Sequence, residues 1–267
     1  MDNLRIYIPS LCRADRQRTH KSIPQLWQPY VTIVVGAGEE ELYERNNPGA
    51  YIVACPLEGI SNVRQWIMEN ANCKYVLMLD DDMTFNVRRG ERLLVAEPVE
   101  VGHMIGILEQ WLRMGFVHVG ISARQGNNHV DGDFAEVTRV NNAYAFNVDK
   151  FHVAGARFDR LPVMEDFDVT LTLLEKGYPN RVTYKYAWGQ AASGEAGGCS
   201  IYRNDAMQEQ AAFRLKELHP HSVTIKKKVS KQAWGGFSAS ARYDVNIQWK
   251  KAYRPKGVSG ALGKFFK

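Results

Sequence analysis

The sequence predicts an α/β fold in which flanking helices cover a mainly parallel central sheet. Short runs of β-branched and aromatic residues alternate along the chain with stretches of helical periodicity, a spacing typical of βαβ units. One of these runs, Tyr75–Leu79, is apolar at every position, as a strand buried on both faces should be. The 267 residues, of which 45% are apolar, suffice for a large core and exclude a disordered chain, a collagen-like chain or a disulfide scaffold.

The apolar runs and the periodic stretches give the expected elements in order. The expected strands are Leu4–Pro9, Val31–Val35, Tyr51–Ala54, Tyr75–Leu79, Phe116–Ser122 and Val137–Asn147. The expected helices lie within the polar stretch from Arg13 to Trp27 and over Ile60–Asn70, Val99–Met114, Val169–Lys176 and Asp205–Leu218. Ser61 or Asn62 is expected to cap the second helix, and Gly177 to end the fourth.

Two segments lack a regular pattern. Residues Arg124 to Asp133 are expected to form a polar loop. Residues Ala192 to Cys199 are too rich in glycine for regular structure, and their composition suits either a mobile loop beside a ligand or a plain linker.

The net charge of +5 conceals an uneven distribution. Residues 224–267 contain eleven Lys and Arg and one acid, Asp244, so this tail carries +10 and the rest of the chain −5. We therefore expect one domain over residues 1–223 and a basic, aromatic C-terminal extension over residues 224–267 that would form the acceptor-binding part. Such asymmetry favours a polyanionic partner, either nucleic acid or a membrane surface, although a solvated, partly disordered tail would have the same charge.

Aromatic residues are interleaved with the cations of the tail. Cations and aromatics together suit a groove that follows phosphates and stacks an exposed base. The candidate DNA-binding residues are Lys226, Lys227, Lys228, Lys231, Arg242, Trp249, Lys250, Lys251 and Arg254. Alternatively, the aromatics pack on the body while the lysines stay solvated, or the tail binds anionic lipid. The tail has no long apolar helical face, which favours nucleic acid over stable membrane association.

The sequence indicates a reducing compartment. The four cysteines show neither a C-x-x-C motif nor a pairing rhythm, so free thiols are expected. The first residues, MDNLRIYIPS, lack the features of a signal peptide, and no stretch approaches the length of a membrane span. We expect a soluble, cytoplasmic protein.

The strongest local motif is the triplet Asp80-Asp81-Asp82, directly after the apolar run Tyr75–Leu79. Adjacent carboxylates repel one another and need a cation or basic partners. Because side chains alternate along an extended chain, Asp80 and Asp82 can face the same way. Carboxylates suit Mg²⁺ or Mn²⁺, and ligands of open α/β sheets bind at the carboxyl ends of strands. The alternative is an acidic turn that caps a helix.

Two further motifs are ambiguous when taken alone. The pair Glu165-Asp166 precedes an expected helix, where acids interact favourably with the helix dipole, but such a pair could also supply a general base. The turn from Gly59 to Arg64 enters another helix, and its amides and arginine could bind phosphate or a carboxylate. His103, His118, His129 and His152 are isolated and are expected to be structural or surface residues.

Taken in order, these motifs resemble the GT-A nucleotide-sugar glycosyltransferases, over roughly residues 4–190. The resemblance rests on Ile8-Pro9-Ser10 with Arg13, Gly59 to Arg64, Asp80-Asp81-Asp82, and Glu165-Asp166 followed by Leu173-Leu174-Glu175-Lys176-Gly177-Tyr178. The last segment resembles the ED…LLxKGY signature of inverting, family-2-like enzymes. The start Ile-Pro-Ser-Leu-Cys-Arg-Ala, Gly197-Gly198-Cys199 and the basic tail resemble the TET-associated glycosyltransferases. Those are phage enzymes, similar to the base J glucosyltransferase, that glycosylate hydroxymethylated pyrimidines in DNA.

The resemblance implies a Rossmann-like GT-A fold and a role for each matched residue. The residues implied to contact the nucleotide sugar are Pro9, Ser10, Arg13, Glu39, Arg64, Asp80 and Asp81. Asp82, with Asp80, would hold Mn²⁺ or Mg²⁺. Asp166 would deprotonate the acceptor hydroxyl, with Glu165 beside it. Many GT-A enzymes add a C-terminal histidine as a metal ligand, for which His219 and His221 are candidates, although a histidine near a helix end is more often a surface residue.

The implied function is metal-dependent, inverting transfer of glucose or arabinose from a UDP-sugar to the hydroxyl of a 5-hydroxymethylpyrimidine, foremost 5-hydroxymethylcytosine, in phage DNA. Two alternatives stay open. A glycosyltransferase of this kind could act on a polysaccharide, a protein or an already glycosylated base. A module of this fold could also bind nucleic acid without catalysis, although intact Asp80, Asp82 and Asp166 argue against that class.

Overall fold

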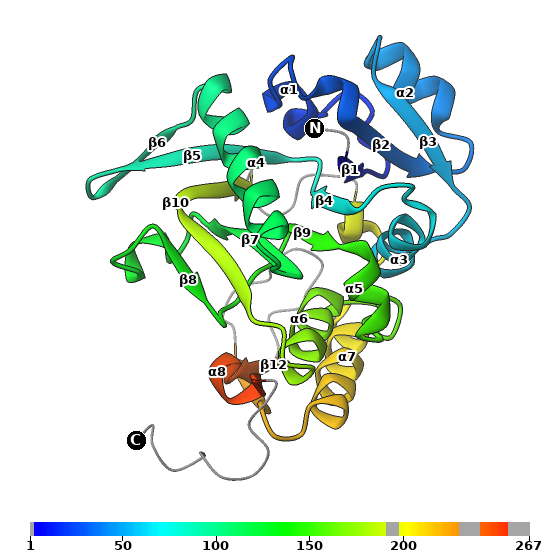
Figure 1. The fold of residues 1–267 in the computed structure, drawn as a ribbon. Helices are drawn as coiled ribbons and strands as arrows, with labels where there is room; N and C mark the ends of the chain where they lie inside the picture. The colour runs from blue at the N-terminus through cyan, green and yellow to red at the C-terminus, as the bar shows by residue number, and fades with distance from the viewer. Residues whose placement is uncertain (1–2, 191–197, 230–240, 256–267) are drawn as a thin grey trace.

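The computed structural model describes residues 3–190, 198–229 and 241–255. Ten strands form one central sheet in the order β3-β2-β1-β4-β9-β7-β10-β5-β6, with β8 also paired to β10 (Figure 1). Strands β1, β2, β3, β4, β6, β7 and β10 run in one direction, and β5, β8 and β9 run in the other. The predicted α/β fold with a mainly parallel sheet is confirmed.

The elements have the following bounds. The strands of the sheet are β1 (Leu4–Pro9), β2 (Val31–Gly36), β3 (Tyr51–Cys55), β4 (Tyr75–Leu79), β5 (Met83–Arg89), β6 (Arg92–Val95), β7 (His118–Ala123), β8 (Phe134–Glu136), β9 (Ala143–Asn147) and β10 (Asn180–Gln190). The helices are α1 (Arg18–Ser22), α2 (Glu40–Asn46), α3 (Ile60–Asn70), α4 (Pro98–Arg113), α5 (Val148–Val153), α6 (Glu165–Glu175), α7 (Asp205–Leu218) and α8 (Trp249–Ala252). The 3₁₀ turns are η1 (Gln28–Tyr30), η2 (Asn127–His129) and η3 (Gly198–Ile201).

Strand β4 is buried on both faces and supplies both major cores. Tyr75, Leu77 and Leu79 belong to one hydrophobic cluster, and Val76 and Met78 belong to another on the opposite face. This is the alternation expected of side chains along a strand. The uninterrupted apolar run in the sequence therefore reflects two layers of helices that cover one sheet.

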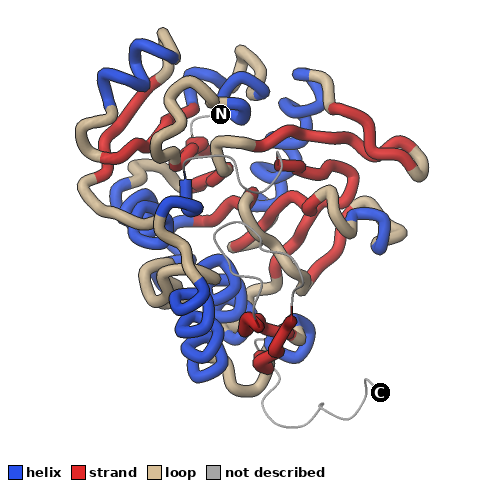
Figure 2. The backbone as a smooth tube through the Cα atoms, turned by 180° about the vertical axis from the view of Figure 1, so that it is seen from behind, coloured by secondary structure: helices blue, strands red, loops and turns tan. Residues whose placement is uncertain are grey.

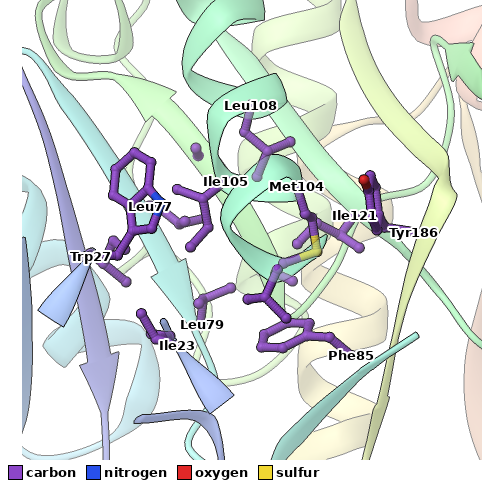
Figure 3. Packing of buried hydrophobic residues seen from close by; sticks show 14 of the residues in the cluster. Ile23, Trp27, Leu77, Leu79, Phe85, Met104, Ile105, Leu108, Ile121 and Tyr186 are labelled. Carbon is purple, nitrogen blue, oxygen red and sulfur yellow. The ribbon is translucent and has the colours of Figure 1, made fainter. Parts of the chain in front are cut away.

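The first cluster fills the space between the sheet and α4. In Figure 3, Met104 and Ile105 of α4 lie against Leu77 and Leu79 of β4. Trp27, from the segment before η1, closes one end of this cluster. The second cluster packs α3, α5 and α6 against the other face of the sheet. Together they fix the carboxyl end of β4.

The helix expected between Arg13 and Trp27 is much shorter than predicted, because only α1 and the turn η1 form there. Pro24 follows α1 closely, and proline cannot continue a helix without losing a hydrogen bond. The residues between β1 and α1 instead form a loop.

Two helix starts differ from the prediction. Helix α3 begins at Ile60, and its cap position is Gly59 with a φ of 85°, so neither Ser61 nor Asn62 is the cap. Helix α6 begins at Glu165, not at Val169. The acidic pair therefore lies inside the first turn of α6, where negative charge is favoured by the helix dipole.

Strand β9 covers only the second half of the strand expected at residues 137–147. Val137 and Asn142 have φ values of 52° and 63°, which no β-strand allows, so the segment between them leaves the sheet. The β5–β6 hairpin and the long strand β10 have no counterpart among the predicted elements. Helices α2 and α5 and the short strand β8 were also not predicted.

Strand β10 pairs in parallel with β7 over most of its length. Its register shifts between Thr183 and Ala187, where a bulge interrupts the ladder. On its other edge the first part pairs with β8 and the last part with β5. The strand thereby ends with Gln190 beside the carboxyl end of β4.

The C-terminal extension forms a hairpin of β11 (Val223–Val229) and β12 (Ala241–Ile247), which packs on α7 (Figure 2). Tyr243, Trp249 and Tyr253 join the hydrophobic cluster of α6 and α7. For these three aromatics, the alternative that they pack on the body is therefore confirmed. The division of the chain at residues 223 and 224 stays a prediction.

No helix in the described ranges is long and apolar enough to cross a bilayer. Cys12, Cys55 and Cys73 are free thiols, as expected. The predicted glycine-rich loop falls largely on residues 191–197, which lie outside the described part of the chain.

A glycine in β7 tests the packing of the sheet. A Cβ added at Gly120 would lie 2.1 Å from Val140 Cγ2 and 3.0 Å from the carbonyl oxygen of Ala143. Gly120→Ala should therefore lower the free energy of unfolding, measured in urea, by about 1–3 kcal/mol. In the control Gly106→Ala, on α4, the new methyl meets nothing within 4 Å, and stability should rise by up to about 1 kcal/mol. Equal stability of Gly120→Ala and the wild type would contradict the packing described.

Candidate active site

The aspartate triplet forms the turn between β4 and β5 and is anchored through its backbone. Thr19 Oγ1 donates to the carbonyl of Asp80 at 2.5 Å and accepts the amide of Met83 at 2.9 Å. The amide of Thr19 donates to the carbonyl of Asp81 at 3.1 Å. The short helix α1 thus holds the acidic turn at the carboxyl end of β4.

Arg13 balances two carboxylates of the triplet. Its Nη1 lies 2.8 Å from Asp81 Oδ1 and 3.1 Å from Asp82 Oδ2. Charge-assisted hydrogen bonds of this kind offset the cost of bringing adjacent carboxylates together. Gly198, which begins η3, lies against the same guanidinium, since a Cβ there would be 3.2 Å from Arg13 Cζ.

Asp81 points inward to a buried network. Ser10 Oγ donates to Asp81 Oδ2 at 2.5 Å, lies 2.8 Å from the hydroxyl of Tyr43, and accepts from Gln17 Nε2 at 2.7 Å. Burial raises the pKa of Asp81 to about 6, although Ser10 and Arg13 both favour its charged form. Through its contacts with Ser10 and Arg13, Asp81 holds the loop after β1 in place.

Asp80 and Asp82 face one shared point, as their alternation predicts. Gln190 Nε2, at the end of β10, lies 3.3 Å from Asp80 Oδ2 and 3.0 Å from Asp82 Oδ1. Asn142 Nδ2 donates to Asp80 Oδ2 at 2.6 Å. Burial, and then the charge of Asp80, raise the pKa of Asp82.

The donor set at this point fits a divalent cation. The carboxylates of Asp80 and Asp82 converge on one amide nitrogen, and a hard cation would bind these carboxylate oxygens better than that amide does. The described residues contain no cluster of three or more His, Cys, Asp or Glu side chains placed to hold a metal. Further ligands would therefore come from a bound diphosphate or from water, as is usual for Mg²⁺.

Arg64 joins the triplet to the acidic pair of α6. Its Nη2 donates to Asp80 Oδ1 at 2.6 Å, and its Nη1 donates to Glu165 Oε1. Arg64 is 5% exposed, and its guanidinium carbon lies over the ring of Tyr144, 5.4 Å from the ring centroid. A buried charge of this kind is strongly destabilising when it loses its partners, so Arg64 holds the two acidic groups at a fixed separation.

Asp166 is the acid of the pair that stays free of Arg64 hydrogen bonds. Its Oδ1 accepts the amide of Phe167 at 2.9 Å. Burial raises the pKa of Asp166 to about 7, and the charge of Glu165 adds to the rise, while Arg64 and Arg139 oppose it. A carboxyl group with a pKa near neutrality is suited to accept a proton from a hydroxyl.

The remaining donor-site candidates line the same edge of the sheet. Pro9 ends β1, and the following amide, that of Ser10, donates to Val34 of β2. Glu39 Oε1 accepts the amide of Cys12 at 3.0 Å, which stabilises a residue with a φ of 55°. A contact between Glu39 and a nucleotide base stays a prediction.

The two histidine candidates differ in their surroundings. His219 is buried, with Nε2 2.8 Å from Asp168 Oδ1 and Nδ1 3.1 Å from Glu175 Oε1. These carboxylates raise the pKa of His219 against the effect of burial. Asp168 is also held by the guanidinium of Arg160. His221 is exposed. A metal-ligand role stays a prediction for both histidines and would require His219 to leave these partners.

The predicted DNA-binding residues lie at the end of the molecule formed by α8 and the C-terminal hairpin. The exposed members are Lys226, Lys227, Lys250, Lys251 and Arg254. Trp249 is half-buried, with its ring 5.7 Å from that of Phe167. Lys231 lies outside the described residues, as do the side chains of Lys228 and Arg242.

Several residues of the site were not predicted. Thr19 and Tyr43 hold the triplet and the loop after β1, and Asn142 and Gln190 contact the carboxylates directly. None belongs to a motif, and both Asn142, just before β9, and Gln190, at the end of β10, are far along the chain from the triplet. Predicting strand β10, which ends at Gln190, would have indicated that this residue lies at the same edge of the sheet as the triplet.

Known structures share this fold. Staphylococcus aureus TarS 1–349 in complex with UDP-GlcNAc superposes with a TM-score of 0.54 at 10% identity, over 80% of this chain and 66% of that one. Glucosyl-3-phosphoglycerate synthase from Mycobacterium tuberculosis in complex with Mg²⁺ and UDP gives a TM-score of 0.52 at 10% identity, over 90% of each chain. The fold is therefore that of the GT-A glycosyltransferases, as expected.

Two phage proteins are similar in sequence along most of the chain. The beta-glucosyl-HMC-alpha-glucosyl-transferase of Enterobacteria phage T6 is 23% identical over 240 residues, which are 84% of this chain and 84% of that protein. The protein of the same name from Enterobacteria phage T2 is 21% identical over 239 residues, with the same coverage. The sequence model of one glycosyltransferase family matches residues 4–198, from β1 to the start of η3. On the strength of that match, this chain is a glycosyltransferase and belongs to the TET-associated glycosyltransferase family.

Proposed function

We propose that this enzyme transfers a sugar from a UDP-sugar to the hydroxyl of a 5-hydroxymethylpyrimidine, foremost 5-hydroxymethylcytosine, in phage DNA. The observation that carries the proposal is the Arg64 bridge, which fixes Glu165 and the neighbouring Asp166 next to the aspartate triplet. The similarity to phage enzymes named for transfer to glucosylated hydroxymethylcytosine supports DNA as the acceptor.

The donor side would be formed by the loop after β1 and the aspartate triplet. Arg13 lies between this loop and the acidic turn, where its cation could meet the phosphates of the nucleotide. Asp82 and Asp80 would hold a divalent cation, which when bound neutralises charge on the leaving diphosphate. Complexes of the similar mycobacterial synthase with UDP and Mg²⁺, or with UDP and Mn²⁺, support this donor and this class of cofactor.

The acceptor side would be formed by the start of α6. Asp166 would take the proton of the acceptor hydroxyl as that oxygen attacks the anomeric carbon. Glu165 would not compete for this proton because its carboxylate is bound to Arg64. Attack opposite the leaving diphosphate would invert the anomeric centre, and no covalent sugar–enzyme intermediate would form.

The second candidate function is transfer to a base that already carries a sugar. The names of the two phage relatives favour it, because both describe transfer to beta-glucosyl-HMC. Their names also specify an alpha-glucosyl product, so the configuration of the new bond is a separate question for this enzyme. Both reactions would use the same donor site, and they differ only in the group that the acceptor base presents to Asp166.

The function can be tested with defined DNA. Duplexes that contain cytosine, 5-hydroxymethylcytosine or beta-glucosyl-hydroxymethylcytosine would be incubated with UDP-glucose or UDP-arabinose and Mn²⁺, and their nucleosides analysed by mass spectrometry. We expect one added sugar on 5-hydroxymethylcytosine, and loss of transfer when the metal is removed with EDTA. Transfer to the glucosylated duplex alone would favour the second candidate, and no transfer to any duplex would exclude both. NMR of the product would give the anomeric configuration.

The role of Asp166 gives a prediction about pH. Because its pKa is raised to about 7, Asp166 is protonated below that pH and cannot act as a base, so kcat/KM should rise with pH up to about 7 and then level off. Asp166→Asn should lower kcat by roughly 10²–10⁴-fold and abolish this rise. Asp149→Asn, an exposed acid on α5, is the matched control and should change neither. Activity of Asp166→Asn close to that of the wild type would remove Asp166 from the mechanism.

The basic extension gives a prediction about DNA affinity. Lys250 and Lys251 are exposed on α8, so the double change to Gln should leave the fold intact. If both lysines contact phosphates, the dependence of log Kd on log salt should become shallower by about two, measured by fluorescence anisotropy. The control is Lys21→Gln with Lys74→Gln, which removes the same charge from exposed positions elsewhere. An equal effect in both double variants would show that only net charge matters.

A further inference from the structure

Arg139 is an exposed arginine that the roles above do not use. It lies between β8 and β9, in the segment Val137–Asn142. Both ends of this segment have a left-handed backbone, with φ values of 52° at Val137 and 63° at Asn142. For a β-branched residue such as Val137 this conformation is strained, and strain of this kind persists where surrounding contacts impose it, often at a binding site.

The contacts that impose this conformation come from both sides of Arg139. Asn180 Oδ1 accepts the amide of Thr138 at 3.0 Å, and Asn180 Nδ2 donates to the Thr138 carbonyl at 2.7 Å. The amide of Val137 donates to the Asn180 carbonyl at 3.2 Å. At the other end, Asn142 is hydrogen-bonded to Asp80. The backbone that carries Arg139 is therefore fixed relative to the active site.

The side chain of Arg139 lies against the residue that follows the proposed base. Its guanidinium carbon is 5.1 Å from the centroid of the Phe167 ring, and Phe167 directly follows Asp166. The ring of Phe167 is in turn held by Trp249, at 5.7 Å and 73°. The charge of Arg139 also acts on Asp166, whose pKa it lowers. Arg139 thus joins the C-terminal extension to the acceptor side of the site.

The position of Arg139 determines what it can bind. Because the Phe167 ring lies at one face of the guanidinium, the N–H donors at its edge remain the binding groups. A planar fork of donors held in this way matches two oxygens of a phosphate. The guanidinium of Arg64, by contrast, binds the carboxylates of Asp80 and Glu165.

We propose that Arg139, held against Phe167, binds a phosphodiester group of the DNA acceptor and thereby positions the reacting base beside Asp166. The inference rests on the proposed DNA acceptor and adds to it the contact that sets the register of the strand. Arg139 is a positioning residue in this account, since Asp166 remains the group that touches the reacting hydroxyl. A phosphate contact fixes register and orientation without reading sequence.

The test is the steady-state kinetics of Arg139→Gln with an oligonucleotide that contains 5-hydroxymethylcytosine. Assays at about pH 8.5 keep Asp166 ionised in every variant. At low salt the KM for the oligonucleotide should rise roughly tenfold, and the slope of log KM against log salt should fall by about one. The KM for the UDP-sugar should stay unchanged. Arg139→Lys should restore the slope, because it keeps the charge, but only part of the affinity, because it lacks the fork.

The matched control is Arg45→Gln, which removes an exposed arginine from α2. It should alter neither KM nor the salt slope, and thermal unfolding should show that both glutamine variants are folded. An unchanged KM for Arg139→Gln would overturn the inference, as would a raised KM with an unchanged salt slope or an effect on kcat alone. A wild-type enzyme without activity on any DNA would refute the proposed function, whereas these outcomes in an active enzyme refute only the role of Arg139.

Discussion

The rest of the structure depends on charge balance at the carboxyl end of β4, where two arginines pair with four carboxylates. Like charges repel, and a buried charge without a partner costs about 3–5 kcal/mol, so the aspartate triplet and Glu165 are stable together only while Arg13 and Arg64 bind them. Arg13 lies in the loop after β1, and Arg64 lies in helix α3, so these ion pairs hold both segments against the triplet. The same network leaves Asp82 and Asp166 as the acids with a raised pKa and no exclusive partner.

The two arginines also link parts of the chain that are distant in sequence. Arg64 depends on the start of α3, where Gly59 has a φ of 85° and the amide of Ile60 donates to the hydroxyl of Tyr202 at 3.0 Å. Tyr202 follows η3, which begins at Gly198 beside Arg13. The proposed donor side therefore includes contacts from a segment that follows the ten-stranded sheet in the sequence. On the proposed acceptor side, α8 makes a similar contact, because Trp249 packs against Phe167.

The sequence carries local information well and long-range information poorly. The burial of β4 on both faces follows from its hydrophobic pattern and was predicted correctly. Asp80 and Asp82 contact the same amide, that of Gln190, as expected, although they lie in a turn. The pairing of Arg64 with Glu165 joins residues that only the folded sheet brings together. The contact of Asn142 with Asp80 depends on a positive φ at Asn142, which the neighbouring sequence does not predict. Arg139 lies in the same irregular segment and belongs to no motif, so the sequence did not indicate its role.

The bulge in β10 constrains how this strand can change during evolution. It shifts the register between Thr183 and Ala187, and the residues after it bring Gln190 to the carboxylates of Asp80 and Asp82. Successive side chains of a strand point to opposite faces, so a deletion of one residue between the bulge and Gln190 would turn this amide away from the site. Insertions or deletions in this stretch should survive only in pairs, and substitutions should outnumber them. The length of β10, and not only its composition, is thus a heritable feature of the active site.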